Sequence, residues 1–270
     1  MPTPGGGFFA VVGTHCAGEV GMNVVGCTIV GCAGALGGGT LNHLLVGRGG
    51  PVFWMADPRF LLFAAVSSVA TFYLWPAAES ALVNHDGKLL LDKPVYLDVQ
   101  RSLGTFEMLH VPHGSKRPKF RYSYALSAWF TLNPQPPNAR AAFTRYTPIL
   151  NYGGKPTVSY NMQKGMLRVR SDAGEGKVTI AEVTGVALQT WNNLVINNDA
   201  GTMDVFLNGE LIGSHPGIAP FMRYEEVLAG ETHGLEGGIC NVVYHPEPMS
   251  QSRIRMGYKM LRDRFPPTFS

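Results

Sequence analysis

The stretch Gly34-Ala35-Leu36-Gly37-Gly38-Gly39-Thr40 lies inside an apolar segment, and Pro51-Val52-Phe53-Trp54 follows it along the chain. Each glycine in a helix costs about 1 kcal/mol relative to alanine. A hydrophobic segment therefore tolerates three in a row only where packed neighbours support the backbone. Because small residues let helix backbones approach closely, the stretch favours a membrane helix surrounded by other helices.

The distribution of charge divides the chain into two parts. Across residues 8–75 the formally charged side chains are Glu19, Arg48, Asp57 and Arg59, whereas charges recur every few residues after residue 78. The first part is therefore expected to be lipid-soluble and the second water-soluble. The net charge of +3 and the pI of 8.7 are too small to indicate a nucleic-acid partner.

Three hydrophobic segments predict about three transmembrane helices, which form a multi-pass anchor over residues 1–78. They cover residues 6–22, 24–46 and 60–75. A helix needs about 20 apolar residues to cross a bilayer, so the second segment is long enough and the third is short unless its flanks join it. Pro76 is expected to close the third helix, because proline disrupts a helix interior.

After the anchor, the hydrophobic period shortens to two. Residues 79–120 are expected as a connector that supplies edge strands and a tether, and residues 121–265 as an all-β antiparallel jelly-roll sandwich. Predicted strands cover residues 125–132, 166–170, 177–180, 193–197 and 203–207. The dipeptide Asn208-Gly209 predicts a type I′ hairpin, and Ser250 is expected to cap a C-terminal helix.

Several motifs of the membrane part keep a distinctive order: Val24-Val25-Gly26, Ala35-Leu36-Gly37-Gly38-Gly39-Thr40-Leu41, Leu44-Leu45-Val46-Gly47-Arg48, Pro51-Val52-Phe53-Trp54 and Asp57-Pro58. Over residues 8–76 the chain thus resembles one repeat of the bacterial glycine-transporter-type membrane proteins, relatives of the trimeric intracellular cation channels. In that family two three-helix repeats of opposite topology build the conducting unit, with glycine-broken helices lining its centre. The expected helix-packing and kink positions are Gly37, Gly38, Gly39, Pro51 and Trp54.

The chain departs from this family at three positions. Asn23 replaces a usual acidic residue, and Asn42-His43 replace an Arg-Asp pair. Charges inside a membrane are costly and are normally kept for ion or substrate handling. Their replacement by neutral groups, together with the single repeat, argues against transport.

The pattern Trp191-Asn192-Asn193-Leu194-Val195-Ile196, then Asp199, then Met203-Asp204-Val205-Phe206-Leu207-Asn208-Gly209 is similar to the centre of laminin-G-like domains of the concanavalin A-like lectin superfamily. The resemblance covers about residues 120–262. It implies the jelly roll and no particular function, because this fold is used by lectins, hydrolases and plain scaffolds.

The sequence offers little evidence for a catalytic or metal site in the sandwich. Hydrolysis of a glycoside needs two carboxylates about 5–10 Å apart, and the Glu-x-Asp-x-x-Glu strand pattern of the glucanase relatives is missing. We therefore expect no enzyme and no cofactor. Asn197, Asn198 and Asp199 are either Ca²⁺ ligands or a plain polar turn.

Three hypotheses about function follow. The first is a non-catalytic, membrane-anchored accessory subunit of a larger membrane complex, with a mitochondrial respiratory-type assembly of the inner membrane as the expected setting. Its partners are then other integral membrane subunits and lipid, and no nucleic acid. The second is a membrane-tethered carbohydrate-binding receptor, and the third is a small-solute transporter or cation channel.

Overall fold

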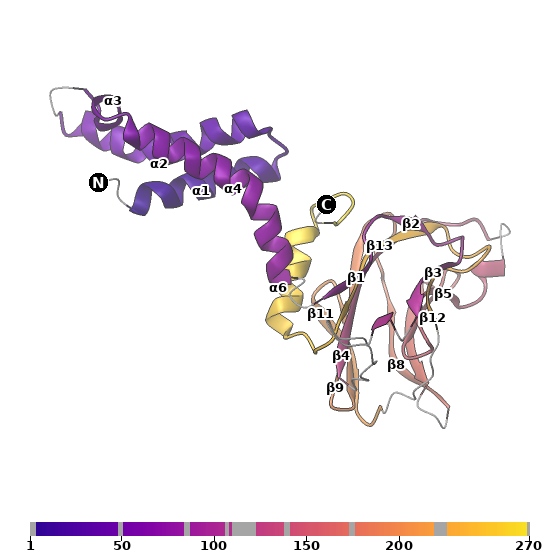
Figure 1. Cartoon of the computed structure of the whole chain (residues 1–270). Helices are drawn as coiled ribbons and strands as arrows, with labels where there is room; N and C mark the ends of the chain where they lie inside the picture. Colours follow the sequence, from indigo (N-terminus) through magenta and orange to yellow (C-terminus); the bar gives the residue numbers. More distant parts are fainter. Residues whose placement is uncertain are drawn as a thin grey trace. The chain divides into compact units, whose positions relative to one another are not determined.

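The computed structural model describes residues 4–47, 51–83, 87–105, 108–109, 123–137, 141–172, 176–218 and 226–268 (Figure 1). The chain divides into two compact units, residues 1–82 and 83–270. The first unit is helical, and the second is a β-sandwich with one long helix near its C-terminus.

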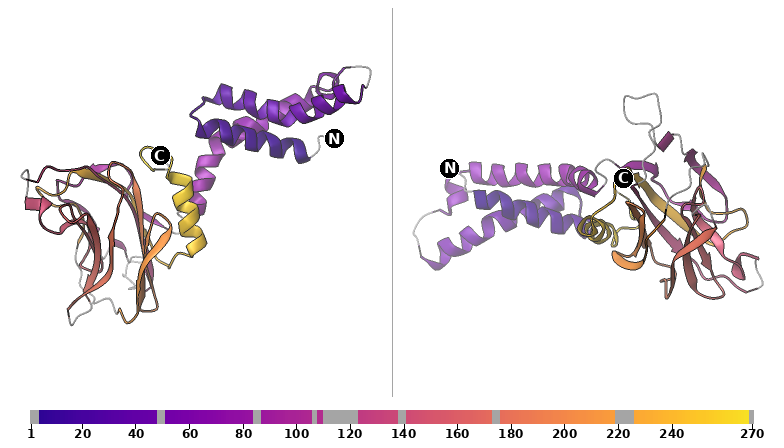
Figure 2. Two further views of the ribbon diagram at one scale, coloured as in Figure 1. Left: turned by 180° about the vertical axis from the view of Figure 1, so that it is seen from behind. Right: turned by 90° about the horizontal axis from the view of Figure 1, so that it is seen from below.

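The helical unit contains α1 (Pro4–Glu19), α2 (Val24–Leu45), the short α3 (Phe53–Ala56) and α4 (Arg59–Val83). Within the unit, α1, α2 and α4 lie side by side (Figure 2). The prediction that Pro76 ends the last helix is wrong, because α4 continues to Val83. Proline removes a single N–H donor, and the Ala-Ala-Glu-Ser-Ala run after it consists mostly of good helix formers.

In the part of the chain that the structure describes, α2 alone is both long and apolar enough to cross a membrane. Its 22 residues extend for about 33 Å at 1.5 Å per residue. The apolar parts of α1 and α4, Gly7–Gly18 and Arg59–Trp75, are shorter. Three transmembrane helices therefore stay a prediction.

The sandwich unit consists of two antiparallel sheets. The seven-stranded sheet has the order β1-β13-β4-β9-β10-β11, with β2 also paired to β13, and the six-stranded sheet has the order β3-β12-β5-β6-β7-β8. The bounds are β1 Lys88–Leu91, β2 Val95–Tyr96, β3 Arg101–Thr105, β4 Tyr124–Leu132, β5 Thr147–Tyr152, β6 Thr157–Asn161, β7 Met166–Asp172, β8 Lys177–Thr184, β9 Asn192–Asp199, β10 Thr202–Leu207, β11 Glu210–His215, β12 Glu226–Ala229 and β13 Gly237–His245. A 3-10 turn, Ala141–Phe143, precedes β5, and α6 (Gln251–Leu261) follows β13.

The strands β1 to β3 change the expected domain boundaries. The sandwich unit begins at Val83 rather than at residue 121, because β1 and β2 pair with β13 and β3 pairs with β12. As predicted, this stretch supplies edge strands, since β1 ends one sheet and β3 ends the other. The boundary of the helical unit lies at Leu82 rather than at residue 78.

The Asn208-Gly209 turn joins β10 to β11 with φ of 53° and 81°, so both residues have the left-handed conformation predicted for this hairpin. The core lies between the two sheets and includes Leu126, Phe130 and Ile149. Three buried tyrosines, Tyr124, Tyr152 and Tyr244, pack on one another with ring centroids 5.3–6.1 Å apart. Burial raises the pKa of the Tyr124 hydroxyl above its ordinary range.

The helix α6 covers the outer face of the seven-stranded sheet. Ser250 caps it, because its hydroxyl accepts a hydrogen bond from the Arg253 N–H at 3.4 Å. Its buried face packs against side chains that point away from the sandwich core, among them Ala125, Trp129, Val195 and Phe206. The central strand β4 is therefore largely buried on both faces and does not alternate between apolar and polar residues.

Candidate functional site

The helices of the first unit make their closest contact at Gly31 of α2. A Cβ added there would lie 2.2 Å from Ser68 Oγ, 2.4 Å from Thr14 Oγ1 and 3.0 Å from the carbonyl oxygen of Ala10. Side chains larger than a hydrogen atom do not fit at such distances. Gly13 of α1 faces the same place, because its Cβ would lie 3.2 Å from Gly31 Cα. The contact among α1, α2 and α4 therefore depends on small residues, as membrane helix packing does.

The glycine triplet was predicted as a helix-packing and kink position. Helix α2 continues through Gly37, Gly38 and Gly39, all three of which are exposed. Apart from the neighbouring residues and the backbone of α2 itself, no heavy atom lies within 4 Å of a Cβ added at Gly37 or Gly38. The close helix contact within the chain is therefore at Gly31 and not at the triplet.

Trp54 and Pro51 lie near the end of α2. The indole Nε1 of Trp54 donates a hydrogen bond to Thr40 Oγ1 at 3.0 Å, which joins α3 to α2 directly after the triplet. Pro51 is exposed in the bend before α3. Asn23, where the related family usually has an acidic residue, caps α2 by accepting a hydrogen bond from the Gly26 N–H at 2.9 Å.

The three residues considered as calcium ligands form the end of strand β9 rather than a turn. Asn197 is buried and its amide is occupied: Nδ2 donates to the Met249 carbonyl at 3.0 Å, and Oδ1 accepts from the Met249 N–H at 2.8 Å. Asn198 is also buried, and alternation along a strand directs it to the opposite face. Asp199 is exposed at the strand end. The structure does not bring the three side chains together.

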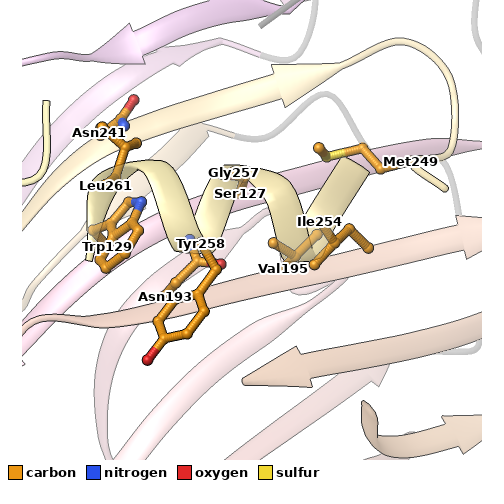
Figure 3. Close-up of a pocket in the computed structure, with 10 residues that line it drawn as sticks. All are labelled: Ser127, Trp129, Asn193, Val195, Asn241, Met249, Ile254, Gly257, Tyr258 and Leu261. Carbon is orange, nitrogen blue, oxygen red and sulfur yellow. The ribbon is translucent and has the colours of Figure 1, made fainter. Parts of the chain in front are cut away.

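A small cavity lies between α6 and the outer face of the seven-stranded sheet (Figure 3). Its volume of about 20 Å³ is enough for one water molecule and too small for a sugar ring. Trp129 and Tyr258 close one side, with their rings stacked at 5.9 Å. Asn193 and Asn241 supply polar atoms at its lining.

The outer face of the six-stranded sheet presents a different set of groups, which we name the Tyr146 cluster: Tyr146, Lys164, Arg168 and Arg170. The guanidinium carbon of Arg168 lies 3.3 Å from the centroid of the Tyr146 ring, and Lys164 Nζ lies 5.8 Å from it. The cluster was not predicted as a site. The alternation of Arg168 and Arg170 with buried Leu167 and Val169 is the sequence signal that places both arginines on one face.

Comparison with protein families supports both resemblances. A family model described as "Glycine transporter" matches residues 3–76, and a model described as "Concanavalin A-like lectin/glucanases superfamily" matches residues 107–255. The N-terminal segment is thus similar to membrane proteins of the glycine-transporter type, and the second match covers more than half of the chain.

Among curated proteins, the inner membrane protein YadS of Escherichia coli K12 is 39% identical over 66 residues. These residues are 24% of this chain and 31% of YadS, so the chain spans about a third of that relative. YadS of a second Escherichia coli strain, O6:H1, is also 39% identical over 66 residues.

Solved structures match the sandwich at low identity. The binding domain of botulinum neurotoxin serotype D is 11% identical with a TM-score of 0.48, over 64% of this chain and 46% of that one. Trypanosoma rangeli sialidase is 16% identical with a TM-score of 0.39, over 51% of this chain and 22% of that one.

Proposed function

This chain belongs to the concanavalin A-like lectin/glucanases superfamily, and we propose that it is a non-catalytic, membrane-anchored accessory subunit of a larger membrane protein assembly. In this proposal the helical unit packs in the bilayer against helices of other subunits. The sandwich makes contacts outside the bilayer.

The distribution of polarity in the helical unit is the main support. The buried side chains that the structure describes there are small or hydroxyl-bearing: Ala10, Thr14, Ala17, Cys27, Ala64, Ser68 and Thr71. Large apolar side chains point outward instead, with exposed fractions of 64% for Phe8, 65% for Ile29 and 65% for Leu62. Such a surface would be insoluble in water and suits lipid or neighbouring helices.

A role in attachment fits the neutral polar residues and the open glycines of α2. Asn23 acts as a helix cap, and Asn42 and His43 replace charged groups. The triplet Gly37, Gly38 and Gly39 is open on the surface of α2, so a helix of another subunit can approach it closely.

Native gel electrophoresis after gentle detergent extraction tests the proposal. The tagged full chain should migrate with a large assembly. A Gly37→Leu variant should dissociate from that assembly, because the position has open space around an added Cβ and the larger side chain obstructs the approach of a neighbouring helix. Ile29→Leu, which changes an exposed residue at constant volume, is the matched control and should migrate as the unchanged protein does. Migration of the unchanged chain as a free monomer or dimer contradicts the proposal.

Carbohydrate binding is the second candidate, and the Tyr146 cluster on the outer face of the six-stranded sheet favours it. A glycan array probed with the full chain in nanodiscs should then give signals that weaken in a Tyr146→Leu variant. A blank array argues against this function. Transport, the third hypothesis, predicts solute flux through vesicles that contain the purified chain alone.

The comparisons give no support to the mitochondrial location predicted from the sequence. YadS is described as an inner membrane protein of a bacterium. Fractionation of the cells that produce this protein would identify the membrane.

A further inference from the structure

The Tyr146 cluster holds a cationic group in a fixed position. The Arg168 guanidinium stacks on the Tyr146 ring at 3.3 Å, and the attraction between a cation and an aromatic face limits its motion. The Arg168 side chain is 16% exposed, so most of its surface is covered by neighbouring side chains. Arg170, two residues further along β7, places its guanidinium on the same face, and its Nε donates to Thr179 Oγ1 at 3.2 Å.

The positive charge of this cluster is incompletely balanced. Arg168 Nε is buried without a hydrogen-bond partner, and the Glu182 carboxylate lies 4.0 Å from it, beyond hydrogen-bonding distance. Asp172 is the next acidic residue on this face of β7, so two carboxylates, those of Glu182 and Asp172, accompany the three cations of the cluster here. Burial and the neighbouring charge of Arg170 both lower the pKa of Arg168, so the two cations repel each other.

A guanidinium of this kind is a receptor for oxyanions. Its planar N–H groups match the oxygens of carboxylate, sulfate and phosphate, and charge-assisted hydrogen bonds to it are stronger than neutral ones. The Cα atoms of two residues that are two apart along a strand lie about 6.6 Å from each other, so Arg168 and Arg170 both contribute positive charge to the same part of the sheet surface. Lys164, exposed beside the ring, adds a third cation.

We propose that the Tyr146 cluster binds an oxyanion group, a carboxylate, sulfate or phosphate, of a ligand outside this chain. Arg168 is the principal contact, Arg170 and Lys164 add charge, and Tyr146 positions Arg168. The ligand lies on the sheet surface, and its charged group determines binding. This inference goes beyond the proposed function and does not depend on it, because attachment to an assembly requires no small ligand.

Isothermal titration of the full chain in a neutral detergent at low salt tests the proposal. The probes are inorganic phosphate, a heparin-derived disaccharide as a sulfated sugar, and inositol 1,4,5-trisphosphate as a lipid headgroup. At least one probe should bind. If the disaccharide binds more tightly than the inositol phosphate, the natural ligand is a sulfated sugar; the opposite order indicates a lipid headgroup. Raising the salt concentration should weaken binding, because ions screen the interaction.

The affinities of four variants distinguish binding at this site from non-specific electrostatic attraction. Arg168→Gln should weaken binding at least tenfold, and Arg168→Lys, which keeps the charge without the planar fork, should weaken it less. Tyr146→Leu should weaken binding although no charge changes, which a purely electrostatic surface would not show. Arg255→Gln on the exposed face of α6 removes the same charge elsewhere and should leave affinity unchanged.

The contact of the anion with Arg168 can also be followed directly by nuclear magnetic resonance. The Arg168 Nε–H resonance should shift on addition of phosphate in the unchanged protein, and melting curves establish that each variant is folded. Equal affinity in the unchanged protein and in Arg168→Gln or Arg168→Lys overturns the proposal. Failure of all three probes to bind at low salt overturns it as well.

Discussion

The indole of Trp54 donates a 3.0 Å hydrogen bond to the hydroxyl of Thr40, which itself donates to the Leu36 carbonyl at 2.8 Å. This pair joins the short helix α3 to the last turns of α2. The hydrogen bond fixes the position of Trp54 against the helix turn that follows the glycine triplet.

Thr40→Val should destabilise the helical unit by about 1 kcal/mol, because it leaves the Trp54 N–H unpaired at nearly constant side-chain volume. The matched control is Thr28→Val, which removes a similar bond to the Val24 carbonyl in the same helix without an indole partner. Denaturation by sodium dodecyl sulfate, followed by circular dichroism, measures both. Equal losses would show that the indole contact adds no stability.

Gly31→Ala should destabilise the helical unit by about 2 kcal/mol or more, because the new methyl group meets Ser68, Thr14 and the Ala10 carbonyl. Gly37→Ala should be neutral or stabilise it by up to about 1 kcal/mol, since the site is open and alanine favours helix. The same denaturation experiment compares the two. A larger loss of stability in Gly37→Ala than in Gly31→Ala would contradict the helix contact at Gly31.

Asn197→Ala should release the start of α6, because both the N–H and the carbonyl of buried Met249 lose their partner. We expect a loss of about 3 kcal/mol in the sandwich and faster amide exchange over residues 249–261. Asp199→Ala, at the exposed end of the same strand, is the control. Added calcium should not change the melting temperature of the unchanged protein; a rise that Asn197→Ala abolishes would restore the calcium hypothesis.

His245 should make the sandwich sensitive to acid. Burial and the nearby charge of Arg253 lower the pKa of His245 to about 4, from an ordinary value of 6.5. The unfolded state therefore binds more protons between these values, and stability is complete above pH 6.5 and falls as the pH drops toward 4. The total change is about 3 kcal/mol. His245→Gln should flatten the pH profile of the unfolding free energy relative to His215→Gln, and parallel profiles would exclude this histidine as the cause.

Much of the architecture could be predicted from residue patterns. Two-residue periodicity predicted strands such as β7, because a strand with one face on a core alternates its side chains, whereas β4 is largely buried on both faces and does not show such alternation. Asn208-Gly209 predicted its hairpin, because few other residues adopt positive φ. The helix after Ser250 was predicted for the same local reason, a side-chain oxygen that caps free N–H groups.

Contacts between distant segments could not be predicted in this way. The sequence drew attention to Gly37, Gly38 and Gly39, yet the close helix contact is at Gly31, because Thr14 and Ser68 from two other helices meet there. Asn197 looked like a ligand in a turn, yet Met249, 52 residues away, occupies its amide.

The sequence by itself determined that a charge-poor helical part precedes an antiparallel sandwich, because hydrophobic period and turn chemistry are local properties of the chain. Only the tertiary structure decided that α6 covers one sheet and that Arg168 stacks on Tyr146 over the other. Those outcomes depend on which side chains meet across long loops, and that information lies in three-dimensional packing rather than in any one segment.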